Sequence, residues 1–146
     1  SSEGFSLEAP VELKLGSWAG QGRPFYSDTV LYEYAVDIPP AASSLHVELG
    51  KWSGSLAELL LDGKRAGLIA WQPYAADFPA APGRHTLGVR IVPTPRNLFG
   101  PFHNPSRPRM AATPGYWAHP PAKQPPGAAY DVLDYGLMED IRVSIN

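Results

Sequence analysis

Apolar and polar residues alternate with a period of two in several segments of this chain, and this pattern is the strongest constraint on its fold. In the clearest segment, residues 30–38, apolar and aromatic side chains fall on one face, while Glu33 and Asp37 fall on the other. A period of two indicates a β-strand with one buried face. Pro39 and Pro40 have no N–H for a ladder, so the strand is expected to end before them. The same alternation predicts strands over residues 11–15, 45–49, 87–91 and 141–145.

A tight turn is expected between residues 56 and 71. The pair Asp62-Gly63 is flanked by apolar residues, and such a pair suits a type I′ turn, whose two central residues have positive φ. Leu56, Leu59 and Leu60 would also suit a short helix, but the turn and the lack of helical length favour a β-hairpin. The alternation at the C-terminus places the chain end in a sheet, so its truncation is expected to be damaging.

Composition narrows the class of protein. The 17 prolines and 14 glycines lie between the alternating segments, as turn residues do. We therefore predict an all-β fold, an antiparallel β-sandwich forming a single domain over residues 1–146. The 12 basic and 14 acidic side chains nearly cancel, and no apolar run is long enough to cross a bilayer, so neither nucleic acid nor membrane is an expected partner. The chain has no cysteine for disulfide or thiolate chemistry, and its start shows no signal peptide, which suggests a removed leader or an excised module.

Catalytic and metal motifs are absent from the sequence. It contains no phosphate-binding loop, nucleophile elbow or His-Glu-x-x-His motif. The acidic residues are interpreted as solvated strand-face and turn residues, and the four histidines do not have metal-ligand spacing. No cofactor is expected, although a structural calcium held by scattered loop oxygens stays open.

Aromatic and planar polar side chains suggest sugar binding. Residues 93–129 lack alternation, and a loop of that length in a compact domain is usually functional or disordered. Sugars present apolar C–H faces ringed by hydroxyls, which aromatic rings and Arg, Asn or His side chains recognise. Alternatively, these side chains cap the ends of the sandwich, with Arg96 and Asn97 satisfying buried carbonyls. The candidate ligand contacts are Trp71, Tyr74, Arg96, Asn97, His103 and Trp117.

Three segments carry a resemblance to a known family. They are residues 22–34 (GRPFYSDTVLYEY), 62–77 (DGKRAGLIAWQPYAAD) and 84–100 (RHTLGVRIVPTPRNLFG). In this order they resemble the jelly-roll, galactose-binding-domain-like sandwiches attached to bacterial glycoside hydrolases. The chain departs from the family pattern at Asp28, where glycine is more usual, and in its proline-rich stretch after Phe102.

The resemblance implies an accessory domain that packs beside a catalytic domain of the same polypeptide. On this basis we expect a non-catalytic carbohydrate-binding module of a secreted or periplasmic glycoside hydrolase, binding a polysaccharide or oligosaccharide. The alternative is a structural accessory domain that docks on the catalytic domain without binding sugar, through an apolar patch of loop aromatics. A small hydrolase in its own right ranks last.

Overall fold

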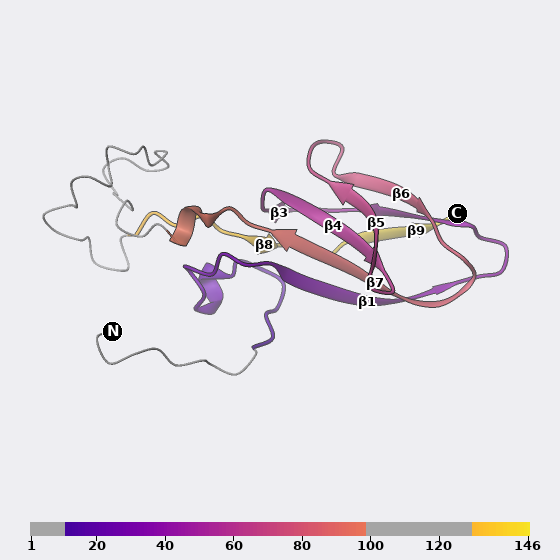
Figure 1. Cartoon of the computed structure of the whole chain (residues 1–146), viewed down its shortest axis with the longest axis horizontal. Coiled ribbons are helices and arrows are strands. Elements are labelled where there is room, and N and C mark those ends of the chain that lie inside the picture. Colours follow the sequence, from indigo (N-terminus) through magenta and orange to yellow (C-terminus); the bar gives the residue numbers. More distant parts are fainter. Residues whose placement is uncertain (1–10, 99–129) are drawn as a thin grey trace, which may run out of the picture.

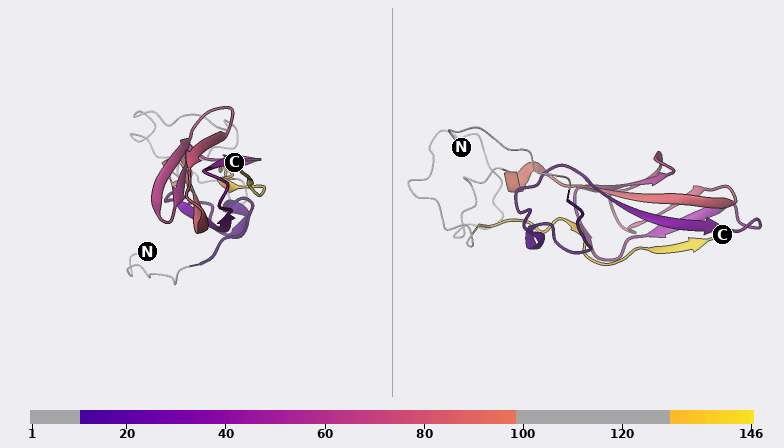
Figure 2. Two further views of the ribbon diagram at one scale, coloured as in Figure 1. Left: turned by 90° about the vertical axis from the view of Figure 1, so that its right-hand side faces the viewer. Right: turned by 90° about the horizontal axis from the view of Figure 1, so that it is seen from below.

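The chain folds into two facing antiparallel sheets with a short two-stranded ribbon at one end (Figure 1). The computed structural model describes residues 11–98 and 130–146. One sheet has the order β1-β7-β4-β5, the other β6-β2-β9, and the ribbon pairs β3 with β8. Figure 2 (right) shows β1 and β7 side by side, with β9 apart from them in the other layer. The strands are β1 (Val30–Ile38), β2 (Ser44–Glu48), β3 (Trp52–Ser53), β4 (Leu56–Leu61), β5 (Lys64–Ile69), β6 (Ala75–Pro79), β7 (Gly83–Val92), β8 (Gly136–Leu137) and β9 (Arg142–Ile145), and two 3-10 turns are η1 (Ala19–Gln21) and η2 (Pro95–Leu98).

The core fills the space between the two sheets. Strand β1 has the predicted bounds, with Tyr32 and Val36 buried and Glu33 exposed. The predicted strands at residues 45–49, 87–91 and 141–145 are confirmed as β2, β7 and β9. Because each strand contributes alternate side chains to one face, the residues removed from water are those that the alternation selects. They include Leu45, Val47, Leu59, Phe78, Leu87, Val89 and Ile91.

The predicted hairpin is confirmed. Asp62 and Gly63 have φ of 50° and 75°, as a type I′ turn requires, and Leu61 pairs with Lys64 across it. Residues 56–61 form strand β4, so the helical alternative was wrong. Within the described residues no helix is long and apolar enough to cross a membrane.

The predicted strand over residues 11–15 was wrong. This segment joins none of the sheets, and Val11 and Leu15 are exposed. The backbone of this segment is instead hydrogen-bonded to a side chain. The Gln21 side-chain amide accepts a hydrogen bond from the Lys14 N–H at 2.8 Å and donates one to the Lys14 carbonyl at 3.0 Å. The period of two is present here, but the backbone groups of Lys14 are not available for a ladder.

A histidine–aspartate pair holds the β4–β5 turn against β7. His85 Nδ1 lies 2.7 Å from Asp62 Oδ2, and the other Asp62 oxygen accepts the Thr86 N–H. The Asp62 carboxylate raises the pKa of His85, while hydrogen bonds from the Thr86 N–H and then from His85 lower the pKa of Asp62. The His85 contribution is therefore complete below its ordinary pKa of 6.5 and is lost as the pH rises through the raised value. The Asp62 contribution is complete above its ordinary pKa of 3.8 and is lost as the pH falls through the lowered value.

We expect replacement of His85 by glutamine to lower the melting temperature more at about pH 5 than at about pH 9, because only protonated His85 forms the ion pair. Thermal unfolding of both proteins across this range measures the difference. Asp62→Asn keeps an oxygen for Thr86 but removes the charge, and in that background the pH dependence of the His85 effect is expected to disappear. If the difference in melting temperature between the wild type and His85→Gln does not change with pH, the ion pair between His85 and Asp62 is contradicted.

Candidate functional site

The sequence-predicted contacts Trp71 and Tyr74 lie in the loop between β5 and β6, which projects from the sandwich (Figure 1). The Trp71 side chain is 76% exposed. Tyr74 is half-buried, and its ring meets Trp52 edge-on, with centroids 5.4 Å apart. The Tyr74 carbonyl also accepts the Leu49 N–H at 2.8 Å. This loop therefore presents one exposed ring, on a base that Tyr74 fixes.

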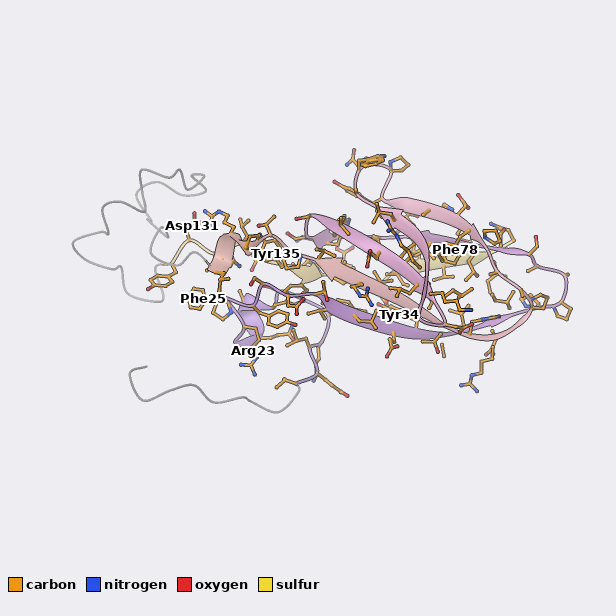
Figure 3. The ribbon with its side chains drawn as sticks, in the orientation of Figure 1. Arg23, Phe25, Tyr34, Phe78, Asp131 and Tyr135 are labelled. Carbon is orange, nitrogen blue, oxygen red and sulfur yellow. The ribbon has the colours of Figure 1, made fainter. Side chains whose placement is uncertain are left out.

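Arg96 and Asn97 lie in η2 and contact the segment that leads into β8. The Arg96 guanidinium donates to the Asp131 carbonyl at 2.9 Å and to its carboxylate at 2.7 Å. Asn97 is 2% exposed; its amide donates to the Leu133 carbonyl and accepts the Leu133 N–H, both at 2.8 Å. These bonds match the alternative in which both residues satisfy the backbone of an irregular segment. Figure 3 places Asp131 beside η2.

The six predicted contacts do not form one described site. The β5–β6 loop and η2 lie at different places on the sandwich (Figures 1 and 3). His103 and Trp117 lie outside the described residues.

A groove of about 990 Å³ lies along the opposite edge of the sandwich from β5 and β6. Its walls are the segment 11–15, the loop 23–29 and β1, and Asp140 borders it just before β9. Strand β1 is the edge of one sheet and β9 is an edge of the other, so the groove opens where the two layers are not joined. Its charged and aromatic side chains are Glu12, Arg23, Tyr26, Tyr32, Glu33, Tyr34 and Asp140; aliphatic residues and Thr29 complete the lining.

Tyr26 provides a fixed aromatic ring at this groove. Its ring packs edge-on against Trp18, with centroids 5.8 Å apart, and its hydroxyl donates to the Thr29 carbonyl at 3.1 Å. Trp18 is itself held, because its indole N–H donates to the buried Tyr32 hydroxyl at 2.9 Å. Burial, and secondarily the Asp28 carboxylate, raise the pKa of Tyr26. Tyr26 as a residue is 39% exposed, so it is anchored but still accessible from solvent.

Tyr34 and Asp140 both line the groove, one from β1 and the other from the turn before β9. Burial, and secondarily the Asp140 carboxylate, raise the pKa of the Tyr34 phenol well above its usual range. The Ile141 N–H donates to Asp140 Oδ1 at 2.9 Å. Figure 3 shows Tyr34 on β1 and Arg23 nearer the N-terminal side of the same region. A carboxylate oriented by a backbone N–H still has acceptor capacity for a ligand.

Sequence reasoning missed this groove. The alternation assigned Tyr32 and Tyr34 to the buried face of a strand, which is correct for Tyr32. It could not show that β1 is an edge strand, which leaves Tyr34 half-buried and beside Asp140. The only signal was the concentration of tyrosines between residues 26 and 34.

Across the described parts of the chain, no three histidine or carboxylate side chains converge in a way that could hold a metal ion. An open trough with an aromatic ring, phenols, carboxylates and a guanidinium can contact both the apolar faces and the hydroxyls of a sugar.

Comparison with protein families and with curated proteins found no match. Among solved structures, the chain is similar to a rhamnosidase from Novosphingobium sp. PP1Y, with 21% identity and a TM-score of 0.50 over 82% of this chain and 11% of that one. Two structures of a GH2 beta-galacturonidase from Eisenbergiella tayi, bound to galacturonate and to glycerol, match 60% of this chain and 16% of theirs, with 25% and 23% identity and TM-scores of 0.42 and 0.40. The chain thus spans about a tenth of the rhamnosidase. By fold, the described residues form an antiparallel β-sandwich, similar to one segment of that rhamnosidase.

Proposed function

We propose that this chain is a non-catalytic, carbohydrate-binding accessory domain of a glycoside hydrolase. The observation that carries the proposal is the groove along β1, where an anchored tyrosine ring lies beside oriented hydrogen-bonding groups. The fold supports it, because the similar segment is only 11% of a rhamnosidase, as expected of an accessory domain. The proposed partners are a polysaccharide or oligosaccharide and the catalytic domain of the same polypeptide, in a secreted or periplasmic enzyme.

Sugar recognition at the groove follows from the chemistry of its lining. The part-exposed Tyr26 ring can cover the C–H face of one sugar ring, and a ring that is already held in place loses little entropy on binding. Arg23 is a donor and the carboxylates are acceptors for ring hydroxyls. The groove is open to solvent, so affinity is expected to be weak, because desolvation of hydroxyls offsets much of the gain.

Paired substitutions test the proposal and its location. Tyr26→Leu keeps apolar contact with Trp18 but removes the flat ring, and we expect it to weaken glycan binding about tenfold, the upper range for one aromatic contact. Trp71→Ala, in the β5–β6 loop, is the matched control and is expected to leave affinity unchanged. Calorimetry on a glycan that binds the wild-type chain in a polysaccharide panel measures both.

The opposite result, a loss with Trp71→Ala alone, would move the sugar contact to the β5–β6 loop that the sequence suggested. If no glycan binds the folded wild-type chain at millimolar concentration, carbohydrate binding is disproved. Turnover of nitrophenyl glycosides by the purified chain would contradict the proposal that the domain is non-catalytic.

A second candidate function is a purely structural domain that docks on its catalytic domain. The 76% exposed Trp71 side chain favours this function, since a tryptophan at a tight loop tip suits an interface. In that case Trp71→Ala is expected to weaken association with the separately expressed catalytic domain, whereas Tyr26→Leu is not.

A further inference from the structure

The charge of the groove limits which sugars it can accept. Glu12, Glu33 and Asp140 line it together with one guanidinium, that of Arg23, so its charged side chains carry a formal charge of −2 at neutral pH. We infer that the groove binds neutral sugar chains and rejects uronic acids. This inference rests on the proposed function and adds the class of sugar.

The hydrogen-bond acceptors of the groove also favour neutral sugars over uronic acids. Asp140 lines the groove together with Tyr34, and its carboxylate accepts the Ile141 N–H at 2.9 Å, which orients it there. A sugar hydroxyl can donate a proton to such a carboxylate. A uronate group has no proton to donate at neutral pH, so at this position two acceptors and two negative charges would face each other.

Position along the strand provides an internal control. Glu33 and Asp37 are both exposed, lie four residues apart on β1 and point to the same face. Glu33 lines the groove and Asp37 does not; Asp37 lies opposite Arg84 in the β1–β7 register. Neutralising either residue changes the net charge of the chain equally, but only Glu33→Gln changes the charge of the groove.

Repulsion between unit charges a few ångströms apart in water corresponds to about a fivefold loss of affinity for each close carboxylate. With two or three carboxylates at the groove, we expect a uronate chain to bind about tenfold or more weakly than its neutral counterpart at low ionic strength, and the gap to narrow in added salt.

The experiment measures the full 146-residue chain against matched pairs of oligosaccharides that differ only in oxidation at C6. Each pair is a uronate chain (polygalacturonate, polyglucuronate or polymannuronate) and the neutral chain made from it by reduction of its carboxyl groups. Calorimetry at low and high salt gives the affinity for each member. Glu33→Gln and Asp140→Asn are expected to recover several-fold of the uronate binding, and Asp37→Asn none. An unchanged melting temperature verifies the fold of each variant.

Three results would count against the inference. If a uronate chain binds as tightly as its neutral partner, or more tightly, the selection is wrong while the proposed sugar-binding function stands. If Asp37→Asn recovers uronate binding as well as Glu33→Gln does, overall charge decides, and the assignment to the groove is wrong. If neither member of any pair binds and no glycan of the polysaccharide panel binds at millimolar concentration, the proposed function itself is disproved and the inference with it.

Discussion

Replacing Gly136 with alanine is expected to destabilise the domain by about 3 kcal/mol, which lowers the melting temperature by about 10 °C for a chain of this length. Gly136 has φ of +128°, a conformation that L side chains rarely adopt. A Cβ there would lie 2.7 Å from both the Gly16 carbonyl oxygen and the Trp18 indole nitrogen. Relief of these contacts would disturb the Gly16 N–H bond to Leu137 and the Trp18 bond to Tyr32.

Gly22→Ala is the control that separates the conformational cost of positive φ from the steric cost of the close approach at Gly136. Gly22 also has positive φ, +81°, but an added Cβ would meet nothing within 4 Å. We expect it to cost about 1 kcal/mol, the conformational penalty alone. Urea unfolding of both variants measures the difference. Equal losses would show that the close approach of residues 16–18 to Gly136 contributes nothing to stability.

The Gly136 contact also bears on function, because Trp18 supports the Tyr26 ring at the groove. A folded Gly136→Ala protein is therefore expected to bind glycan more weakly than Gly22→Ala, although neither glycine lines the groove. Calorimetry on both proteins below their melting temperatures measures this difference.

Asn97→Ala is expected to cost about 3 kcal/mol of the free energy of unfolding, because the N–H and carbonyl of Leu133 would both lose their partner in a buried site. The Asn97 side chain is almost fully buried and forms two hydrogen bonds of 2.8 Å to this one residue. It therefore holds residues 130–133 to η2 much as a backbone pair would.

Leu98→Ala is the neighbouring control, since Leu98 belongs to the same turn and is 56% exposed. Its effect is expected to stay within about 0.5 kcal/mol, as for other surface positions. Thermal and urea unfolding, with glycan binding measured in parallel, distinguish the two roles of Asn97. A stable Asn97→Ala protein that no longer binds sugar would establish the ligand contact that the sequence suggested.

The sequence was most informative where a local residue pattern is compatible with only one backbone structure. Alternation over residues 30–38 selected the buried face of β1, and Asp62-Gly63 selected the turn, because few other pairs adopt two positive φ angles. It failed at residues 11–15, which have the same alternation. There the Gln21 side chain binds the backbone of Lys14, and a periodicity of side chains carries no information about that bond.

The candidate site was less predictable, because its parts are distant in sequence. Tyr34 and Asp140 line the same groove although they lie more than a hundred residues apart in the chain, and this depends on β1 and β9 being edges on the same side of the sandwich. Arg96 and Asn97 looked like sugar contacts in the sequence, whereas their partners, Asp131 and Leu133, lie 35 and 36 residues further on. Residue type identified side chains able to bind a sugar, but not which of them another part of the chain already occupies.

The sequence by itself therefore determined the all-β class, most strands, the hairpin and the apolar face of each strand, since these follow from local periodicity and backbone conformation. Only the tertiary structure decided which strands are edges, that Gly136 lies against Trp18, and that a groove lined by Tyr26, Tyr34 and Asp140 opens beside β1. The physical reason is that strand order and long-range hydrogen bonds depend on how the sheets pack on each other, which no local pattern encodes.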